Sequence, residues 1–242
     1  MAKERLDKIL ANRGNLSRKE GRVLIWQGGV TVNGLVVKQP DYKVDTQQDR
    51  VTLQGEELLI QEHLYLMLHK PQGVVSATED SRFPTVVDLV PEKLRRKGLF
   101  PAGRLDKDTE GFVLLTDDGA FAHRILAPKN HLPKRYLAHL DHPLDDGLME
   151  EFAKGVRLSE EDRCSPALLT ILENGANPRV EVTIHEGMYH QIKRMFERFG
   201  YRVIYLKRLQ IGGLPLDPAL PLGECRMLTG EELAAVTKGY LD

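Results

Sequence analysis

The stretch Pro101–Gly119, PAGRLDKDTEGFVLLTDDG, sets acidic residues around an apolar run that should be buried. Arg104 and Asp106 lie two residues apart, between Gly103 and Gly111 and just before this β-rich run. A carboxylate in such a loop can act as a nucleophile or as a general base, and strand ends commonly carry sites. A polar turn in which Arg104 and Asp106 form a local ion pair is the commoner fate of such residues. The residues alone leave both interpretations open.

A calcium loop is a third interpretation of the same stretch. Asp106 and the acidic residues that follow it, with Gly111, roughly match the start of an EF-hand loop. The ninth position would then be Leu114, and the twelfth would be Asp117, where a bidentate glutamate is expected. The second half of the loop also has the pattern of a buried strand instead of a helix start. We therefore expect no calcium here.

Motifs for other chemistry are not evident. The sequence has no phosphate-cradling G-x-x-x-x-G-K-[ST], no dinucleotide-binding G-x-G-x-x-G and no G-x-S-x-G nucleophile elbow. Its eight histidines are scattered, and its two cysteines, Cys164 and Cys225, are far apart. Neither pattern suits a zinc site or a disulfide framework. We expect no metal and no cofactor.

The first 60 or so residues have the pattern of a compact α+β module. Apolar residues near the start have helical spacing, and a second helix opens with Ser17 and Glu20, a capping box. Gly28 ends that helix, and two β-rich runs then surround Asn33 and Gly34, a strong hairpin signal. The segment RLDKILANRGNLSRKEGRVLIWQGGVTVNGLVV resembles the S-four-type (alpha-L) RNA-binding domain. The resemblance implies docking on folded RNA through basic residues, namely Arg5, Arg18, Lys19 and Arg22.

The chain beyond about Ile60 alternates strand-length apolar runs with turns. The expected strands are YLMLH, GFVLLT, RYLAHL, RVEVTIHEG and RVIYLKRLQIG, and helical patterns fall at LMEEFAKG, HQIKRMFERFG and, after a capping box at Thr229 and Glu232, ELAAVTKG. We expect an α+β fold, in which a small N-terminal module (residues 1–60) precedes a larger domain (residues 61–242) with a mixed, mainly antiparallel sheet.

The larger domain resembles the pseudouridine synthases. GRLDKDTEGFVLLTDDG is similar to their hallmark motif, in which the Asp after GRL is the essential catalytic residue, here Asp106. KRYLAHL matches a second motif and assigns Tyr136 to face the target base. EGMYHQIKRMFERFG matches a third and assigns Lys193 to pair with the catalytic carboxylate. HKPQGVVSA resembles the NKPxG segment of the family, with His69 in place of Asn.

The chemistry of this family gives these residues a physical purpose. Uridine becomes pseudouridine when the C1′–N1 bond breaks, uracil rotates and C5 joins C1′, so no cofactor is required. Burial would raise the pKa of a carboxylate beneath the base, and a cation such as Lys193 would counter that. A base taken out of its stack loses a few kcal/mol, which stacking on Tyr136 would partly recover. Arg104 would hold the phosphate of the flipped nucleotide, or the loop itself.

Charge is distributed unevenly along a chain whose net charge is -1. The segment from Met1 to Ile25 contains seven basic and three acidic residues. The segment from His190 to Arg208 contains six basic residues, including Lys193 and Arg194, and one acidic residue. These two basic stretches could bind a polyanion, although solvated helix faces would look the same. No apolar run approaches the ~20 residues of a membrane helix, and the start is charged instead of apolar. We expect a cytoplasmic monomer.

The order of the two domains, together with YHQIKRMF, TDDGAFAHRI and FAKGVRL, resembles the small-ribosomal-subunit branch of the family. That resemblance implies one uridine of 16S rRNA as the target, in bare RNA or in a small-subunit assembly particle. Two alternatives remain open at this point. One is the same reaction on 23S rRNA, and the other is a non-catalytic rRNA-binding assembly factor that has kept the fold.

Overall fold

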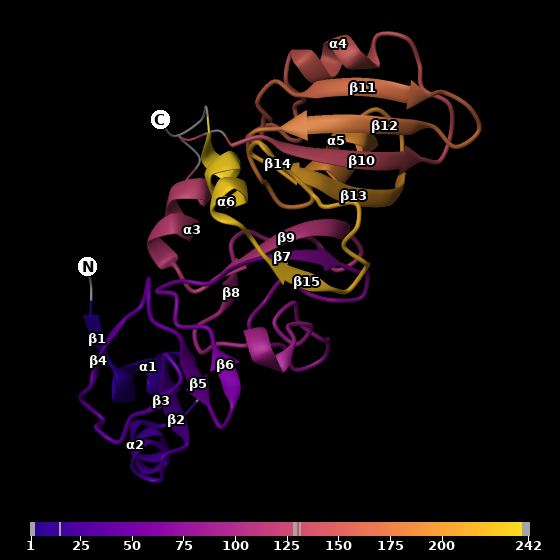
Figure 1. Cartoon of the computed structure of the whole chain (residues 1–242). Coiled ribbons are helices and arrows are strands. Elements are labelled where there is room, and N and C mark those ends of the chain that lie inside the picture. Colours follow the sequence, from indigo (N-terminus) through magenta and orange to yellow (C-terminus); the bar gives the residue numbers. More distant parts are fainter. Residues whose placement is uncertain (1–2, 15, 128–129, 131, 239–242) are drawn as a thin grey trace. The chain divides into compact units, whose positions relative to one another are not determined.

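The computed structural model describes residues 3–14, 16–127, 130 and 132–238 (Figure 1). The chain forms two compact units, one of Met1–Leu64 with Val90–Phe100 and the other of Tyr65–Leu89 with Pro101–Asp242. The sequence-based boundary between residues 60 and 61 did not anticipate that residues 90–100 belong to the first unit, and as a domain boundary it stays a prediction. Within the described residues, no helix has the length and apolar character needed to cross a membrane.

The helices of the N-terminal unit are α1 (Leu6–Arg13) and α2 (Arg18–Trp26). The predicted capping box starts α2, because Ser17 Oγ accepts a hydrogen bond from the Glu20 backbone N–H at 3.2 Å and Glu20 Oε2 accepts one from the Ser17 N–H at 2.7 Å. The helix ends just before Gly28, which adopts a left-handed conformation. Both predicted boundaries of this helix are therefore confirmed.

Short antiparallel strands complete this unit: β1 (Lys3–Arg5) pairs with β4 (Lys43–Asp45), and a four-stranded sheet has the order β3 (Leu35–Val36), β2 (Val30–Val32), β5 (Val51–Leu53) and β6 (Glu56–Leu58). The predicted hairpin at Asn33 and Gly34 is confirmed. Both residues have positive φ, 52° and 81°, as a type I′ turn requires. A single apolar core, which includes Leu6, Ile9 and Ile25, joins the helices to the sheet.

The larger unit is built on a mixed sheet with the order β11-β12-β10-β13-β9-β7-β15 (Figure 1). Its strands are β7 (Tyr65–Lys70), β9 (Glu110–Thr116), β10 (Lys134–Leu140), β11 (Leu168–Glu173), β12 (Arg179–Ile184), β13 (Val203–Ile211) and β15 (Cys225–Met227), while β14 (Leu214–Pro215) pairs with β13 and β8 (Phe100–Pro101) with β9. The strands β13 and β9 run parallel to each other. The pairs β10–β12, β10–β13, β11–β12, β13–β14, β15–β7 and β7–β9 are antiparallel. The predicted α+β class with a mainly antiparallel sheet is confirmed.

Helices lie against this sheet at several points. They are α3 (Gly119–Leu126), α4 (Leu148–Ala153), α5 (Gln191–Glu197) and α6 (Gly230–Thr237), and a 3-10 turn, η1 (Glu92–Leu94), belongs to the other unit. The helix α4 contacts β11, α5 contacts β13 and α6 contacts β14. Thr229 and Glu232 form the predicted capping box of α6.

Gly111 sets the contact between the two parallel strands. It pairs with Arg208, and its φ of 108° is one that side-chain-bearing residues rarely adopt. A Cβ at position 111 would lie 2.3 Å from the carbonyl oxygen of Arg208. Only glycine allows β9 to approach β13 this closely, so the glycine in the opening stretch is a requirement of the sheet.

Candidate active site

The backbone of the loop that carries Asp106 is held by the side chain of Lys70, the last residue of β7. The side chain of Lys70 is fully buried. Its Nζ donates to the carbonyl oxygens of Thr109 at 2.8 Å, Asp106 at 3.0 Å, Pro71 at 3.0 Å and Lys107 at 3.3 Å. An ammonium group has three N–H donors, so these carbonyls occupy all of them. Lys70 thus holds the backbone of the loop in one conformation.

Two further contacts hold the same loop. Ser76 Oγ accepts a hydrogen bond from the Leu105 N–H and donates to the Leu105 carbonyl, both at 2.9 Å. The Gly73 N–H donates to the Lys107 carbonyl at 2.8 Å. Because the backbone on both sides of Asp106 is tied down, its carboxylate has a defined position.

The Asp106 carboxylate meets the start of α5. Lys193 Nζ lies 3.1 Å from Asp106 Oδ2 and 2.6 Å from Asp108 Oδ1, and His190 Nε2 lies 3.6 Å from Asp106 Oδ1. Arg104 forms no ion pair with Asp106 in the described part of the chain, so the local Arg104–Asp106 pair considered above is wrong. Lys193, 87 residues away in sequence, is the cation that Asp106 contacts.

The electrostatics of this group follow from its partial burial. Burial acts to lower the pKa of Lys193, but hydrogen bonds to Asp108 and Asp106 outweigh it and raise that pKa above its usual value. Burial also acts to raise the pKa of Asp108, yet the hydrogen bond from Lys193 leaves it lowered. Lys193 is therefore a stable cation between two carboxylates. Lys70, by contrast, faces only carbonyl oxygens, and burial lowers its pKa to about 8.

Tyr136 lies on β10 with 7% of its surface exposed. It pairs across the sheet with Arg208 of β13. Arg208 Nη1 approaches the Tyr136 hydroxyl at 3.4 Å, and Arg208 Nε donates to the Phe112 carbonyl at 2.7 Å. The guanidinium, itself buried, therefore fixes the phenol end of Tyr136.

One pocket of the larger unit collects the predicted site residues. Arg104, Asp106, Tyr136 and Lys193 all line it, together with residues that include Ile184, Met188, His190, Gln191 and Leu206. A cation, a carboxylate and an aromatic ring thus face one space with apolar walls. In the described residues, no group of three or more His, Cys, Asp and Glu side chains is arranged to hold a metal ion. The catalytic roles of Asp106, Tyr136 and Lys193 stay predictions.

The basic residues predicted to contact RNA differ in their surroundings. In the N-terminal unit, Arg5 and Arg22 both bind the buried carboxylate of Asp7 at 3.0 Å, while Arg18 and Lys19 are exposed on α2. The shared carboxylate lets two half-exposed guanidiniums lie together with a net positive charge.

The second basic stretch is less positive than its sequence suggests. Arg194 binds Asp162 at 3.0 Å and does not line the pocket, while Arg202 lies 3.9 Å from Asp141. The positive charge of Lys193 is balanced by the carboxylates of Asp106 and Asp108, and Arg208 is buried. Carboxylates from distant loops thus lie beside three of the six cations of this stretch, while Arg198 is exposed. Binding of a polyanion by this stretch stays a prediction.

Sequence reasoning missed several side chains that shape the site. They are Lys70, Asp108, His190 and Arg208. A lysine at the end of an apolar strand was the available signal for Lys70. His190 has a left-handed backbone conformation with a φ of 47°, and no sequence pattern predicts this. His69, the residue that replaces Asn, is nearly buried, and its Nδ1 lies 2.8 Å from the Leu220 carbonyl, which makes it part of the core.

Comparison with known proteins identifies the family of this chain. The model of the RNA pseudouridylate synthase family matches residues 64–198, more than half of the sequence. The chain belongs to the RNA pseudouridylate synthase family. It is thus a pseudouridine synthase, an isomerase, and the S4 domain model matches residues 4–51 ahead of the synthase domain.

Relatives of this synthase are similar over nearly its whole length. An uncharacterized RNA pseudouridine synthase, YtzG, of Bacillus subtilis is 49% identical over 95% of this chain and 96% of its own. The ribosomal small subunit pseudouridine synthase A of Escherichia coli K12 is 44% identical over 96% of this chain and 99% of its own. A crystal structure of a pseudouridylate synthase, 39% identical, has a TM-score of 0.67 over 96% of this chain and 99% of its own.

Proposed function

We propose that this synthase converts one uridine of 16S rRNA to pseudouridine during maturation of the small ribosomal subunit, with Asp106 as the catalytic carboxylate. The observation that carries the proposal is the 3.1 Å contact of Lys193 with Asp106 in a pocket that Tyr136 also lines. The target is supported by the small-subunit synthases of Escherichia coli and Yersinia pestis, each 44% identical to this chain.

The conversion of uridine to pseudouridine has three steps that the pocket must support. The C1′–N1 bond must break, uracil must rotate, and a C5–C1′ bond must form while C5 loses its proton and N1 gains one. A carboxylate can serve as nucleophile or base in such a sequence. Lys193 places an opposing charge 3.1 Å from that carboxylate. The loop anchored by Lys70 delivers that carboxylate in a fixed position, so little reorganisation is required when the nucleotide enters.

Tyr136 and Arg104 would hold the nucleotide. A flipped base costs a few kcal/mol in lost stacking, and an aromatic face recovers about 1–3 kcal/mol. The Arg208 contact keeps the Tyr136 ring from turning away from the pocket. Arg104 is exposed, lines the pocket and is free of Asp106, so its guanidinium is available to a phosphate oxygen.

The N-terminal unit would dock the enzyme on its RNA. Arg5 and Arg22, held together by Asp7, and the exposed Arg18 and Lys19 form its positive surface. Phosphate contacts of this kind position a protein without reading sequence. An rRNA substrate would place the enzyme in the cytoplasm with the assembling ribosome.

The test of the target is a site map of the product. Purified enzyme would be incubated with bare 16S rRNA, bare 23S rRNA and small-subunit assembly particles, and pseudouridines would be located by carbodiimide modification and reverse transcription. We expect one new stop in 16S rRNA, in bare RNA or in particles. A new stop in 23S rRNA alone would refute the 16S target. Tight binding with no stop in any RNA would favour the non-catalytic assembly factor.

A further inference from the structure

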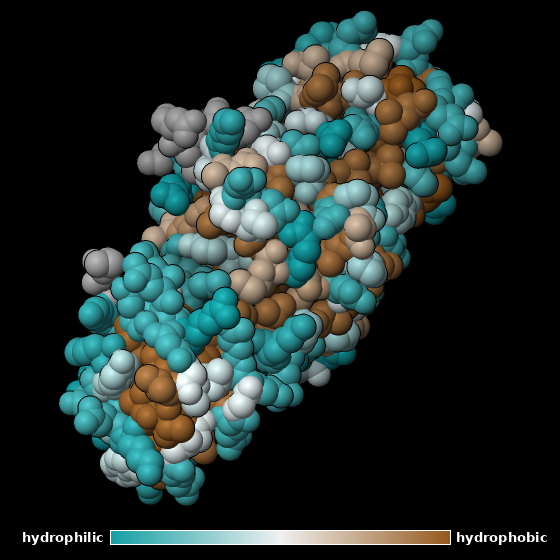
Figure 2. All heavy atoms as spheres, viewed as in Figure 1, coloured by the Kyte–Doolittle hydropathy of each residue, from teal (hydrophilic) through white to brown (hydrophobic). Residues whose placement is uncertain are grey.

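The N-terminal unit exposes its aromatic and apolar side chains at the end of α2. Trp26, the only tryptophan of the chain, is 60% exposed, and Val23 and Val36 are exposed as well. An atom added at Gly28 would lie 3.4 Å from Val36 Cγ1 and 3.8 Å from Lys38 Cε, so both side chains border the end of the helix. Figure 2 shows hydrophobic side chains at the surface near β3, bordered by hydrophilic ones. We call Val23, Trp26 and Val36 the Trp26 patch.

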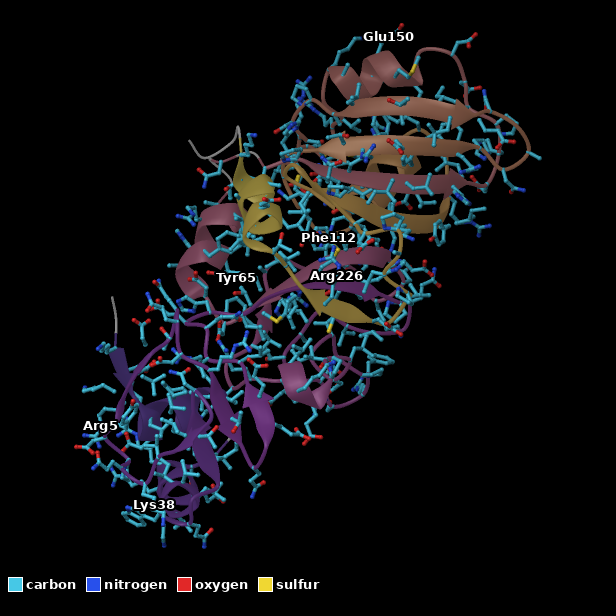
Figure 3. All side chains as sticks on the ribbon, in the orientation of Figure 1. Arg5, Lys38, Tyr65, Phe112, Glu150 and Arg226 are labelled. Carbon is cyan, nitrogen blue, oxygen red and sulfur yellow. The ribbon has the colours of Figure 1, made fainter. Side chains whose placement is uncertain are left out.

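Cations surround this patch. Arg22 and Lys19 precede Trp26 by four and seven residues, so all three lie on the same face of α2. Lys38 projects outward near α2 at the other border (Figure 3). Glu20 is the acidic residue of α2, and its carboxylate is occupied by the Ser17 N–H. The partner that fits this surface is therefore negatively charged and also offers an apolar face.

Arg22 is fixed in a way that suits a phosphate. Its Nε and Nη2 bind Asp7 Oδ2 at 3.1 and 3.0 Å, and Asp7 also binds Arg5. One carboxylate thus orients two guanidiniums and leaves a net positive charge at the surface. Trp26 follows Arg22 by one helical turn, about 6 Å along the axis. A phosphate at Arg22 would hold its own base within reach of the indole.

We propose that the Trp26 patch is a binding site for an unpaired nucleotide of structured RNA, whose base stacks on Trp26 while its backbone phosphates contact Arg22 and Lys19 or Lys38. The inference rests on the proposed function only in requiring that the N-terminal unit docks on RNA. A duplex does not offer base faces to a side chain, so the site recognises a loop, bulge or single strand.

The single tryptophan makes the site directly measurable. Full-length protein would be titrated with an RNA hairpin whose loop contains six adenosines, and with the same hairpin carrying abasic loop residues. We expect the adenosine loop to quench Trp26 fluorescence at saturation and the abasic loop to leave it unchanged. Trp26→Ala should weaken binding of the adenosine loop about 5- to 100-fold, as expected for loss of one base–aromatic stack, and leave the abasic hairpin unaffected.

Matched variants separate stacking from other contacts. Trp26→Phe should bind the adenosine loop within about threefold of the wild type, because an aromatic face remains. Leu35 lies on β3 beside Val36, and its side chain is 74% exposed. Leu35→Ala removes this other apolar side chain and should leave binding of the adenosine loop unchanged. Binding of both hairpins without quenching, or equal losses in Trp26→Ala and Leu35→Ala, would overturn the stacking site alone. No binding of either hairpin would overturn it together with RNA docking by this unit.

Discussion

At the scale of single residues, the site depends on two lysines with opposite surroundings. Lys193 lies between the carboxylates of Asp106 and Asp108 and is held as a cation. Lys70 is fully buried and contacts only backbone carbonyls of the loop that carries Asp106. One lysine therefore sets the charge of the site, and the other sets its geometry.

Replacement of Lys193 tests the first of these roles. In Lys193→Met, Asp106 and Asp108 lose the cation between them, and with it the hydrogen bond that holds the pKa of Asp108 below its usual value. We expect turnover to fall by about 100-fold or more, while RNA affinity changes less than about threefold. Because Asp108 then binds a proton at higher pH, the acid limb of the pH–rate profile should also move to higher pH.

The conservative variant provides the control. Lys193→Arg keeps the positive charge and should retain more turnover than Lys193→Met, with its acid limb near that of the wild type. If Lys193→Met lost RNA binding and turnover in equal measure with an unshifted pH profile, Lys193 would be a docking residue and not the partner of Asp106.

At the scale of elements, local signals predicted well and long-range ones did not. Capping boxes and the Asn33–Gly34 turn are short patterns that force one backbone geometry, and both were recognised. The helix α3 was not named, although Asp118 caps it by accepting a hydrogen bond from the Phe121 N–H, a local signal that the sequence offered. The strands β11 and β15, which lie at the two ends of the sheet order, were not named either. The contact of Lys193 with Asp106 spans 87 residues, and only the family resemblance suggested it.

The contact between β9 and β13 is tested by Gly111→Ala. Its Cβ would overlap the Arg208 backbone, so the strands must separate, and we expect a loss of about 4 kcal/mol or more in the free energy of unfolding. Gly200 is the matched control, since it has φ 89° but no atom near the added Cβ. Gly200→Ala should lose only the backbone strain, about 1–2 kcal/mol. Equal losses in urea unfolding would contradict the close-approach explanation.

The start of α6 predicts a pH dependence of stability. Hydrogen bonds from Arg226, at 2.7 and 2.9 Å, lower the pKa of Glu232 to about 2. Because the unfolded state binds a proton at higher pH, this stabilisation is complete above about pH 4.5 and is lost as pH falls toward 2. Glu232→Gln should lower stability by about 1–2 kcal/mol at pH 7 and flatten the decline of stability between pH 4.5 and 2.

The neighbouring residue is the control for this measurement. Glu231 is exposed and forms no ion pair or hydrogen bond in the described part of the chain. Glu231→Gln removes the same charge from the same helix turn and should lose well under 1 kcal/mol, with the slope between pH 4.5 and 2 unchanged. Parallel curves for wild type and Glu232→Gln would refute the proposed linkage.

At the scale of the whole molecule, net charge hides the distribution that matters. The net charge is -1, yet the N-terminal unit exposes Arg18 and Lys19 on one helix, while in the larger unit Lys193 and Arg194 bind carboxylates and Lys70 and Arg208 are buried. Sequence counts could not distinguish the two basic stretches, because pairing of Arg194 with Asp162 and of Arg202 with Asp141 depends on the fold. We therefore propose that the N-terminal unit provides the electrostatic docking surface for RNA.

The salt dependence of RNA affinity tests which unit docks on RNA. If Arg18 and Lys19 each contact a phosphate, the double variant Arg18→Ala/Lys19→Ala should reduce the slope of log affinity against log salt by about 1.4–1.8. The matched double variant Arg179→Ala/Arg202→Ala removes two exposed arginines that lie 3.9 Å from carboxylates in the larger unit, and it should leave the slope unchanged. The reverse pattern would place docking on the larger unit.

The claim that Asp106 performs the chemistry is tested most directly by tritium release. Substrate RNA labelled at C5 of uridine releases tritium when C5 joins C1′, so the release counts completed isomerisations. We expect release by the wild type and by Asp146→Asn, an exposed aspartate outside the pocket, and none by Asp106→Asn, which should still bind RNA. Release by Asp106→Asn at the wild-type rate would contradict the account.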